Sequence, residues 1–358
     1  MRIQDSVSSR RRARSRFGGP ALTVALVAAG LGAAPVDAAD KNAVTRIGGA
    51  DRIETALLTF TKNRALFDPG KAVLTRSDQF ADALAATPLA AALKAPLLST
   101  GRDALDPRVL STLKSTGVNE VVIVGGVGAL SPAVQEALTN AQIKTQRISG
   151  TDRYQTSLAI AQRILDLRKA QPVQEGLAAA SGPIHAYVAR GDDFADSLGA
   201  GGAAGRTGGV LILSMGDTLP DAAKGFLNSG NFNTIAVGGA AAKATDVAGI
   251  EAEKIVGTDR ADTSAKLART LPAPRLVLVS SGLNFADGLA AGVIAALGGG
   301  VVVLTLPDTL TKSVAEYLAE VQVPVTIIGG TAAVGHDVVG QADTANDGII
   351  PPQPQDPP

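Results

Sequence analysis

Short apolar runs alternate with helical patterns along most of the chain. Residues 71–75 (KAVLT) predict a buried strand, and the Ala-rich residues 78–93 predict a helix in spite of Pro88. The alternation continues with predicted strands at residues 96–99 and 119–124 and predicted helices at residues 107–115 and 131–140. Strands that are apolar throughout and separated by helices are typical of a parallel sheet covered on both faces. We therefore expect a small, doubly wound α/β unit with right-handed crossovers.

The same alternation occurs twice more. Matching apolar runs predict strands at residues 186–189, 210–213 and 234–237, and again at residues 276–279, 301–304 and 325–328. The expected fold class is therefore α/β, with three tandem, small, doubly wound (Rossmann-like) parallel-sheet repeats. We place the repeats at residues 39–145, 146–252 and 253–340, with an insertion near residues 171–183 in the second.

Four sequence motifs recur in register with these strands. The segment RIGGADRIET at residues 46–55 returns as RISGTDRYQT at residues 147–156 and as KIVGTDRADT at residues 254–263. Each copy is followed by Phe-Ala-Asp, by an Asp 23 residues after that Phe, and by a Gly-Gly pair beginning 44 or 45 residues after it. Because four landmarks keep their register in all three copies, the chain is an array of internal repeats, which determines the fold class.

The two ends of the chain differ from the repeats. Five Arg residues between positions 10 and 16 precede an apolar run at residues 21–34 and small residues at 36–38, so residues 1–38 are predicted to be a secretory signal peptide. The apolar run is short for a membrane span. Residues 341–358 end in PPQPQDPP and are predicted to be a disordered, Pro-rich tail. We expect no membrane attachment after removal of the signal peptide.

The charge balance limits the possible partners. The chain has 33 basic and 33 acidic residues, of which the first 38 positions hold six Arg and two Asp, so the remainder has a net charge of −4. This balance argues against a nucleic-acid partner, which would require a broadly basic surface. Any anion must therefore be bound by a local cluster of positive charge. The chain has no Cys, so it forms no disulfides in spite of the expected export.

The recurrent Asp-Arg-x-x-Thr motif is expected to begin a helix. Its Asp is well placed as an N-cap in all three copies, and Glu, Gln or Asp follows three residues later as in a capping box; the Asp residues are Asp51, Asp152 and Asp259. A cap does not require the Arg that follows, which is Arg52, Arg153 or Arg260. Two explanations stay open: this Arg pairs with a carboxylate of a neighbouring repeat, or it binds an anionic ligand.

The other motifs have structural explanations. The Phe of Phe-Ala-Asp is expected in the core, and its Asp in the first turn of a helix, where the helix dipole favours negative charge; these residues are Asp82, Asp196 and Asp287. The Gly-Gly pair is interpreted as a tight turn between strand and helix. The chain contains two His residues, His185 and His336, and neither recurs in the other repeats. We find no pattern for catalysis, metal binding or a cofactor, and we expect none of these.

Over residues 45–335 these motifs resemble the bacterial cell wall-binding repeat 2 family. The resemblance rests on the Asp-Arg-x-x-Thr, Phe-Ala-Asp and Gly-Gly motifs, present in three copies behind a signal peptide. It implies three units around a pseudo-threefold axis, with ligand contacts in clefts near the unit boundaries. It also implies non-covalent attachment to the wall of Gram-positive bacteria through an anionic secondary wall polymer. The third copy departs from the pattern, with Lys254 and Val256 in place of Arg and of Gly or Ser.

We therefore expect a secreted protein at the cell wall or cell surface that binds an anionic wall polysaccharide and has no enzymatic activity. The expected polymer contacts are Arg52, Arg153 and Arg260, with Arg46 and Arg147 as supporting positive charge. Two alternatives remain open. A wall-modifying enzyme would have to use residues that do not recur, namely His185, Asp192 and Asp193 with the insertion in the second repeat. A surface-layer protein would instead associate with further copies of itself.

Overall fold

The computed structural model describes residues 43–170 and 183–353. The predicted signal peptide and the insertion at 171–182 lie outside the described residues, as do the last five residues of the tail.

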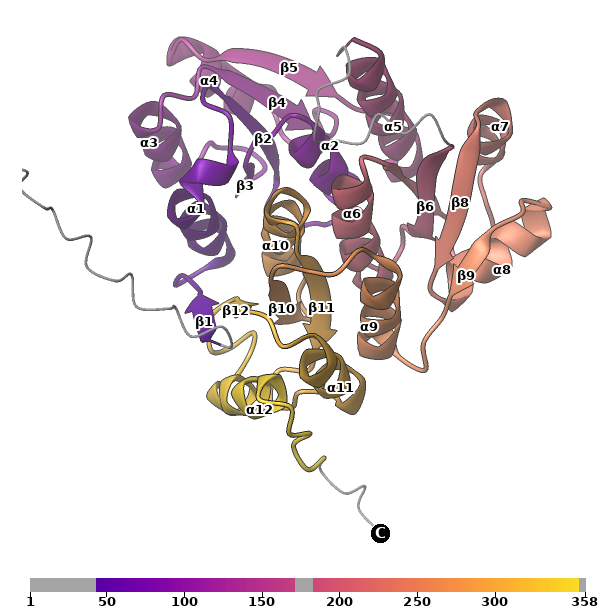
Figure 1. Ribbon diagram of the computed structural model, residues 1–358. Helices are drawn as coiled ribbons and strands as arrows, with labels where there is room; N and C mark the ends of the chain where they lie inside the picture. The colour runs from indigo at the N-terminus through magenta and orange to yellow at the C-terminus, as the bar shows by residue number, and fades with distance from the viewer. Residues whose placement is uncertain (1–42, 171–182, 354–358) are drawn as a thin grey trace, which may run out of the picture. The chain divides into compact units, whose positions relative to one another are not determined.

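Three four-stranded parallel sheets form the framework of the protein (Figure 1). The first has the order β3-β2-β4-β5, the second β7-β6-β8-β9 and the third β1-β12-β10-β11. The strands are β1 (Val44–Ile47), β2 (Lys71–Arg76), β3 (Leu97–Thr100), β4 (Glu120–Val124), β5 (Lys144–Ile148), β6 (Ile184–Arg190), β7 (Val210–Ser214), β8 (Phe232–Val237), β9 (Glu253–Ile255), β10 (Val277–Ser281), β11 (Val301–Thr305) and β12 (Val325–Ile328). The predicted class of three tandem parallel-sheet α/β repeats is confirmed.

The Arg-bearing strand of each motif completes the sheet of the repeat before it. β5 pairs with β4 of the first sheet, and β9 pairs with β8 of the second. β1 pairs with β12, so the first strand of the described chain closes the third sheet. Boundaries placed at 145/146 and 252/253 therefore follow the sequence repeat but not the sheets. We call β1, β5 and β9 the exchanged strands, because each belongs to one repeat and pairs with the sheet of another. Each exchanged strand pairs with backbone groups of β4, β8 or β12 that would otherwise lie unpaired at a sheet edge.

The helix after each motif strand lies against the next sheet. α1 (Arg52–Lys62) contacts β3, α5 (Arg153–Ala170) contacts β7, and α9 (Arg260–Thr270) contacts β11. Each of these strands is the edge of its sheet opposite the exchanged strand. One motif, from strand to helix, therefore connects two sheets.

Three central helices join the repeats around the pseudo-threefold axis. They are α2 (Ala86–Ala92), α6 (Ala195–Thr207) and α10 (Phe285–Gly298), and each contacts the other two. Small residues allow close approach, with only 3.6 Å between the Cα of Gly292 and the position that a Cβ on Gly202 would occupy. A Cβ on Gly205 would lie 2.9 Å from the Ala296 Cβ and 3.0 Å from the Ala91 Cβ. The Ala- and Gly-rich composition of these segments is therefore a packing requirement.

α2 begins later than the sequence predicts. We expected a helix over residues 78–93, but residues 81–85 form turns and the regular helix starts at Ala86. Pro88 has no N–H to donate, and its ring clashes with the carbonyl four residues earlier, so it is tolerated only in a first helical turn. As a consequence, Asp82 lies in the preceding turns, whereas Asp196 and Asp287 lie in the first turns of α6 and α10.

The remaining helices connect successive strands, except for α12, which follows the last strand. They are the 3₁₀ helix η1 (Arg64–Leu66) and the α-helices α3 (Pro107–Ser115), α4 (Pro132–Asn140), α7 (Asp221–Ser229), α8 (Gly239–Ala248), α11 (Lys312–Val321) and α12 (His336–Asn346). α12 extends beyond Gln341, where we expected the disordered tail to begin. Its buried residues Val338, Ala342 and Ala345 lie at helical spacing, and burying them favours continuation of the helix.

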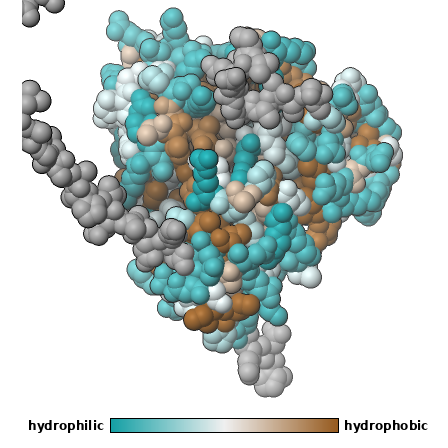
Figure 2. Space-filling model, in the orientation of Figure 1, coloured by the Kyte–Doolittle hydropathy of each residue, from teal (hydrophilic) through white to brown (hydrophobic). Residues whose placement is uncertain are grey.

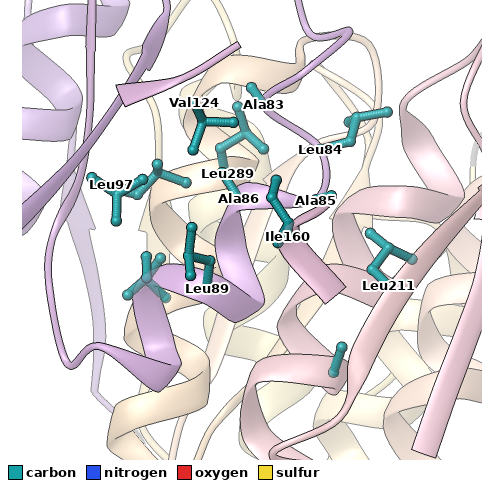
Figure 3. Close-up of a cluster of buried hydrophobic side chains, with 14 of the residues drawn as sticks. Ala83, Leu84, Ala85, Ala86, Leu89, Leu97, Val124, Ile160, Leu211 and Leu289 are labelled. Carbon is teal, nitrogen blue, oxygen red and sulfur yellow. The ribbon is translucent and has the colours of Figure 1, made fainter. Parts of the chain in front are cut away.

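One cluster of buried apolar side chains extends across all three repeats. Figure 3 shows Leu84 and Leu89 of the first repeat beside Ile160 and Leu211 of the second and Leu289 of the third. All five side chains are at most 5% exposed. On the face seen in Figure 2, hydrophilic residues cover much of the surface, with hydrophobic patches between them. The repeats therefore share this cluster and are not independent domains, while the third repeat also has a second, separate cluster that includes Val279, Val303 and Ile327.

The contact of the central helices can be tested with two matched substitutions. We expect Gly205→Ala to destabilise the protein by about 1–3 kcal/mol, because its methyl group would overpack against Ala91 and Ala296. Gly340→Ala in α12, where nothing lies within 4 Å of the added Cβ, should instead stabilise by about 0.5–1 kcal/mol through helix propensity. Urea unfolding measures both, and equal effects would contradict the close packing.

Candidate functional site

The Asp of each Asp-Arg-x-x-Thr motif lies at the N-cap of its helix. The side chains of Asp51, Asp152 and Asp259 each accept a hydrogen bond of 2.8 Å from the backbone N–H three residues later. In the first copy, the Glu54 carboxylate in turn accepts a hydrogen bond of 2.7 Å from the Ala50 N–H. This capping box fixes where the helix begins and hence the direction of the Arg side chain that follows.

The Thr of the motif has a role that the sequence analysis missed. Thr55, Thr156 and Thr263 are buried, and each hydroxyl accepts a hydrogen bond of 3.0 Å from a Gly N–H six residues earlier. The bond closes the loop between the exchanged strand and the helix. The signal was present in the sequence, since both Gly and Thr recur at fixed positions in all three copies.

The three Phe residues of Phe-Ala-Asp meet at the axis. Their ring centroids are 5.7, 5.7 and 6.1 Å apart, within the range of favourable aromatic pairs; the residues are Phe80, Phe194 and Phe285. They lie at or just before the N-terminal ends of the central helices. The Phe was expected in the core, but contact between the repeats, which the sequence did not reveal, is what brings these three together.

The Arg of each motif reaches across a repeat boundary to one of these rings. The guanidinium carbon of Arg52 lies 5.6 Å from the centroid of Phe285, a residue of the third repeat. Arg153 lies in the same way 5.5 Å from Phe80 of the first repeat, and Arg260 lies 5.9 Å from Phe194 of the second. A cation above an aromatic face is attracted by the ring quadrupole. The three contacts form a cycle in which each repeat supplies one Arg and one Phe.

A hydrogen bond fixes each of these guanidinium groups. Nη1 of Arg52 donates to the Ser77 carbonyl at 2.9 Å, Nη1 of Arg153 to the Gly191 carbonyl at 2.6 Å, and Nη1 of Arg260 to the Gly282 carbonyl at 2.5 Å. Each acceptor lies three residues before the Phe of its own repeat. The Arg is therefore held by its own repeat while it covers the Phe of the preceding one.

The Asp of Phe-Ala-Asp lies beside the Gly-Gly turn of its own repeat. The first Gly of the turn has a positive φ of 105° at Gly125 and 130° at Gly329, a conformation that favours Gly. A Cβ at these positions would lie 2.8 Å from Asp82 Oδ2 and 2.7 Å from Asp287 Oδ2. The turn therefore requires Gly both for its backbone conformation and for the close carboxylate.

Two of these carboxylates have perturbed acidity. Burial raises the pKa of Asp287 to about 6, against the opposing effects of the Arg52 charge and a hydrogen bond from Thr55. Burial also raises the pKa of Asp196 to about 6, with a smaller contribution from Asp193, while Arg260 and Arg190 oppose it. These carboxylates are thus close to the boundary arginines but poorly solvated.

Pairing between the Arg and a carboxylate of the neighbouring repeat occurs at the second boundary. Nη2 of Arg260 lies 3.9 Å from Asp193 Oδ2, with each side chain 35% exposed. At the boundary between the first and third repeats, the Arg52 charge partly offsets the rise that burial causes in the pKa of Asp287. The structural explanation for the recurrent Arg therefore has support at two boundaries, and it leaves part of each guanidinium accessible.

Arg46 and Arg147 have a different environment from the boundary arginines. Arg46 donates to the carbonyls of Gly329 at 2.8 Å and Gly335 at 3.0 Å, and Arg147 donates to the Gly125 carbonyl at 2.8 Å. Partial burial lowers the pKa of both guanidinium groups. Both therefore fasten the exchanged strand to the Gly-Gly turn of the sheet that it completes. In the third copy Lys254 makes no such bond and pairs with Asp246 at 2.5 Å.

A cleft of about 460 Å³ opens at the boundary between the first and third repeats. Asp51, Arg52 and Thr55 line one side, and Leu283 and Asp287 line the other. Leu283 is 57% exposed, so it offers an apolar surface at the rim. The cleft therefore combines a fixed cation, a buried carboxylate and an apolar edge, which suits a polar ligand with one anionic group better than a purely apolar ligand.

The residues named for the enzymatic alternative do not come together. His185 is the second residue of β6 and lies 3.3 Å from the Asn233 side chain, whereas Asp192 and Asp193 follow the opposite end of that strand. Asp192 accepts two hydrogen bonds from Arg190. Within residues 43–170 and 183–353, no group of His, Asp and Glu side chains could hold a metal ion. In the same ranges, no helix has the length and apolar character needed to cross a membrane.

The raised pKa of Asp287 predicts a pH dependence of stability. Since the pKa of Asp287 in the folded protein exceeds its unfolded value near 4, the folded state binds more protons between about pH 4 and pH 6, and stability falls as the pH rises through that window. Asp287→Asn should reduce this fall in urea unfolding between pH 4.5 and 7.5. The exposed Asp343→Asn is the control and should keep the original profile. Equal slopes in the two variants would contradict the assignment.

Comparison with known proteins places these motifs in context. The chain is 26% identical over 305 residues to the N-acetylmuramoyl-L-alanine amidase LytC of Bacillus subtilis strain 168, covering 84% of this chain and 58% of that protein. It is 32% identical over 183 residues to an amidase enhancer of the same organism, covering 51% of this chain and 23% of the relative. The chain therefore spans only part of the curated relatives that it matches.

Two solved structures share the fold. Cwp6 from Clostridium difficile superposes with a TM-score of 0.74 at 24% identity, over 85% of this chain and 48% of that one. Cwp8 from the same organism superposes with a TM-score of 0.69 at 24% identity, over 86% and 52%. The model of cell wall binding domain 2 (CWB2) matches residues 46–135, 147–248 and 254–339. With three copies across most of its length, the chain belongs to the CWB2 family of cell wall-binding proteins.

Proposed function

We propose that this protein is exported and is held non-covalently in the cell wall by binding an anionic wall polysaccharide. The observation that carries the proposal is the recurrence of one fixed cation at each repeat boundary, namely Arg52, Arg153 and Arg260. A carbonyl and a Phe ring already hold each guanidinium in place. A side chain that is ordered before the ligand arrives loses less entropy on binding.

Each boundary arginine retains donors for a ligand. Among the described residues, Arg52 and Arg153 each use one nitrogen, Nη1, for hydrogen bonding. Arg has five N–H donors in a planar fork that matches carboxylate and phosphate groups. The remaining donors support charge-assisted hydrogen bonds to such groups on a polymer.

Arg46 and Arg147 contribute indirectly in this proposal. Because their guanidinium groups donate to carbonyls of the Gly-Gly turns, they support the polymer site by positive charge and by holding the exchanged strand. The boundary between the second and third repeats lacks this support, since Lys254 is paired with Asp246 and Arg260 is close to Asp193. We therefore expect that boundary to bind the polymer most weakly.

Three boundary arginines in one compact unit suit a repetitive ligand. A polymer with regularly spaced anionic groups can occupy more than one boundary, and the second contact is then effectively intramolecular. Strong attachment would follow from sites that are individually weak. The family membership and the predicted signal peptide both support action at the wall, outside the cell.

Replacing the three boundary arginines tests the proposal. We expect the triple variant Arg52→Ala, Arg153→Ala, Arg260→Ala to bind purified Gram-positive walls at least tenfold more weakly, because its repeat boundaries lack fixed cations. Binding of the unmodified protein should weaken as salt rises from 50 to 500 mM. Co-sedimentation with walls measures both effects.

Two controls separate binding from folding and from net charge. The variant Lys114→Ala, Lys144→Ala, Lys224→Ala removes the same charge from exposed positions and should bind as the unmodified protein does. The variant with Lys at all three boundary positions keeps the charge but loses the planar fork, and it should bind with intermediate affinity. Full binding by a folded triple Ala variant would remove these arginines as the polymer contacts.

A further inference from the structure

A second cavity lies at the opposite end of the central helices from the three Phe rings. Its volume is about 570 Å³, within the usual range of small-ligand pockets. It forms where the C-terminal ends of α2, α6 and α10 meet α5. Pro88, Leu93, Ile164, Leu167 and Leu297 give it an apolar wall. Because it is built from all three repeats, it exists only in the assembled fold.

The three central helices end in the same way beside this cavity. In each, a backbone N–H bonds to the carbonyl five residues earlier: Ala95 to Ala90 at 2.8 Å, Gly209 to Ala204 at 2.7 Å, and Gly300 to Ala295 at 2.7 Å. A helix end with this hydrogen bond requires a residue in the left-handed backbone conformation just before the donor. The second and third repeats use Gly208 and Gly299, with φ of 63° and 71°.

The first repeat has a lysine at this left-handed position. Lys94 has a φ of 47°, a conformation that costs free energy for a residue with a Cβ and that Gly adopts freely. The helix end does not need the ammonium group, since backbone bonds already satisfy its carbonyls. Strain that the local structure does not require is a reason to look for a ligand contact.

The charges around the cavity favour an anion. Lys71 and Lys94 line it, and among the described residues neither ammonium group has a hydrogen-bond or ion-pair partner. Arg206 also lines it but is occupied, donating to the Gly300 carbonyl at 2.9 Å and the Pro272 carbonyl at 2.8 Å. Asp68 is the acidic residue of the lining and is exposed. Two cations are therefore available beside an apolar wall.

We propose that this cavity binds a single-chain anionic amphiphile, with its carboxylate or phosphate head on Lys71 and Lys94 and its hydrocarbon chain along the apolar wall. The ligand enters as a monomer, since the cavity lies among the ends of four helices and is not a flat surface. The site is separate from the cleft at Arg52 and from the other two boundary arginines, so it does not depend on the proposed polymer binding.

Dodecanoate, used below its micelle concentration, is the probe. We expect it to raise the Tm of the protein and to bind saturably in calorimetry, whereas dodecyltrimethylammonium, with the same chain and the opposite charge, should bind at least tenfold more weakly. Vesicles that contain phosphatidylglycerol test the other source of an anionic lipid head. Binding to vesicles without binding of monomeric dodecanoate would overturn the proposal.

Replacing Lys94 by Gly should keep or raise the stability of the fold and weaken ligand binding. Lys94→Gly introduces the residue that the other two repeats use, so the Tm without ligand should stay the same or rise. Combined with Lys71→Ala, it should weaken dodecanoate binding by about tenfold or more. The control Lys114→Ala, Lys224→Ala removes the same charge elsewhere and should bind as the unmodified protein does. Undiminished binding by the Lys71→Ala, Lys94→Gly variant would refute the site.

Discussion

The exchange of one strand and one arginine between neighbouring repeats is the constraint on which the structure depends. Each motif places its strand in the preceding sheet, its helix on the following one and its Arg over the preceding Phe. The first strand of the described chain completes the cycle by pairing with β12. Displacing one repeat from its neighbour would therefore break a strand pairing and a cation–π contact together. The cleft between the first and third repeats and the cavity at the helix ends both exist because of this closure.

Local patterns were sufficient to predict the elements but not their partners. The apolar runs predicted three of the four strands of each sheet within one or two residues, because strands buried on both faces have a strong sequence signal. They did not predict the exchanged strands β1, β5 and β9. Strand exchange could not be predicted, since β1 and β12 are far apart in sequence and any free sheet edge could accept β1. The start of α2 was predictable from Pro88 in principle, and the Phe cluster was not, because it depends on contact between three repeats.

Differences among the repeats add functional information that the shared motif does not contain. The shared Asp, Gly and Thr of the motif hold the loop before each helix, and this explains their recurrence without a ligand. The boundaries themselves are unequal: Arg260 has Asp193 nearby, Asp287 is buried beside Arg52, and Lys254 replaces an arginine that fastens the Gly-Gly turn elsewhere. Lys94 is a further departure, at a position where symmetry favours Gly. A repeat protein can vary such positions without losing its fold, because the contacts that join the repeats, namely strand pairing and the Arg–Phe pairs, use backbone groups and other side chains.

Attachment to an anionic wall polymer is the central claim, and co-sedimentation with purified Gram-positive walls tests it most directly. The walls are compared before and after acid extraction of their secondary polymers, at low and high salt. If the boundary arginines hold an anionic polymer, intact walls retain the protein at low salt, and both extraction and high salt release it. Equal retention by extracted walls would show that the polymer is not the ligand, and no retention by intact walls would contradict the account as a whole.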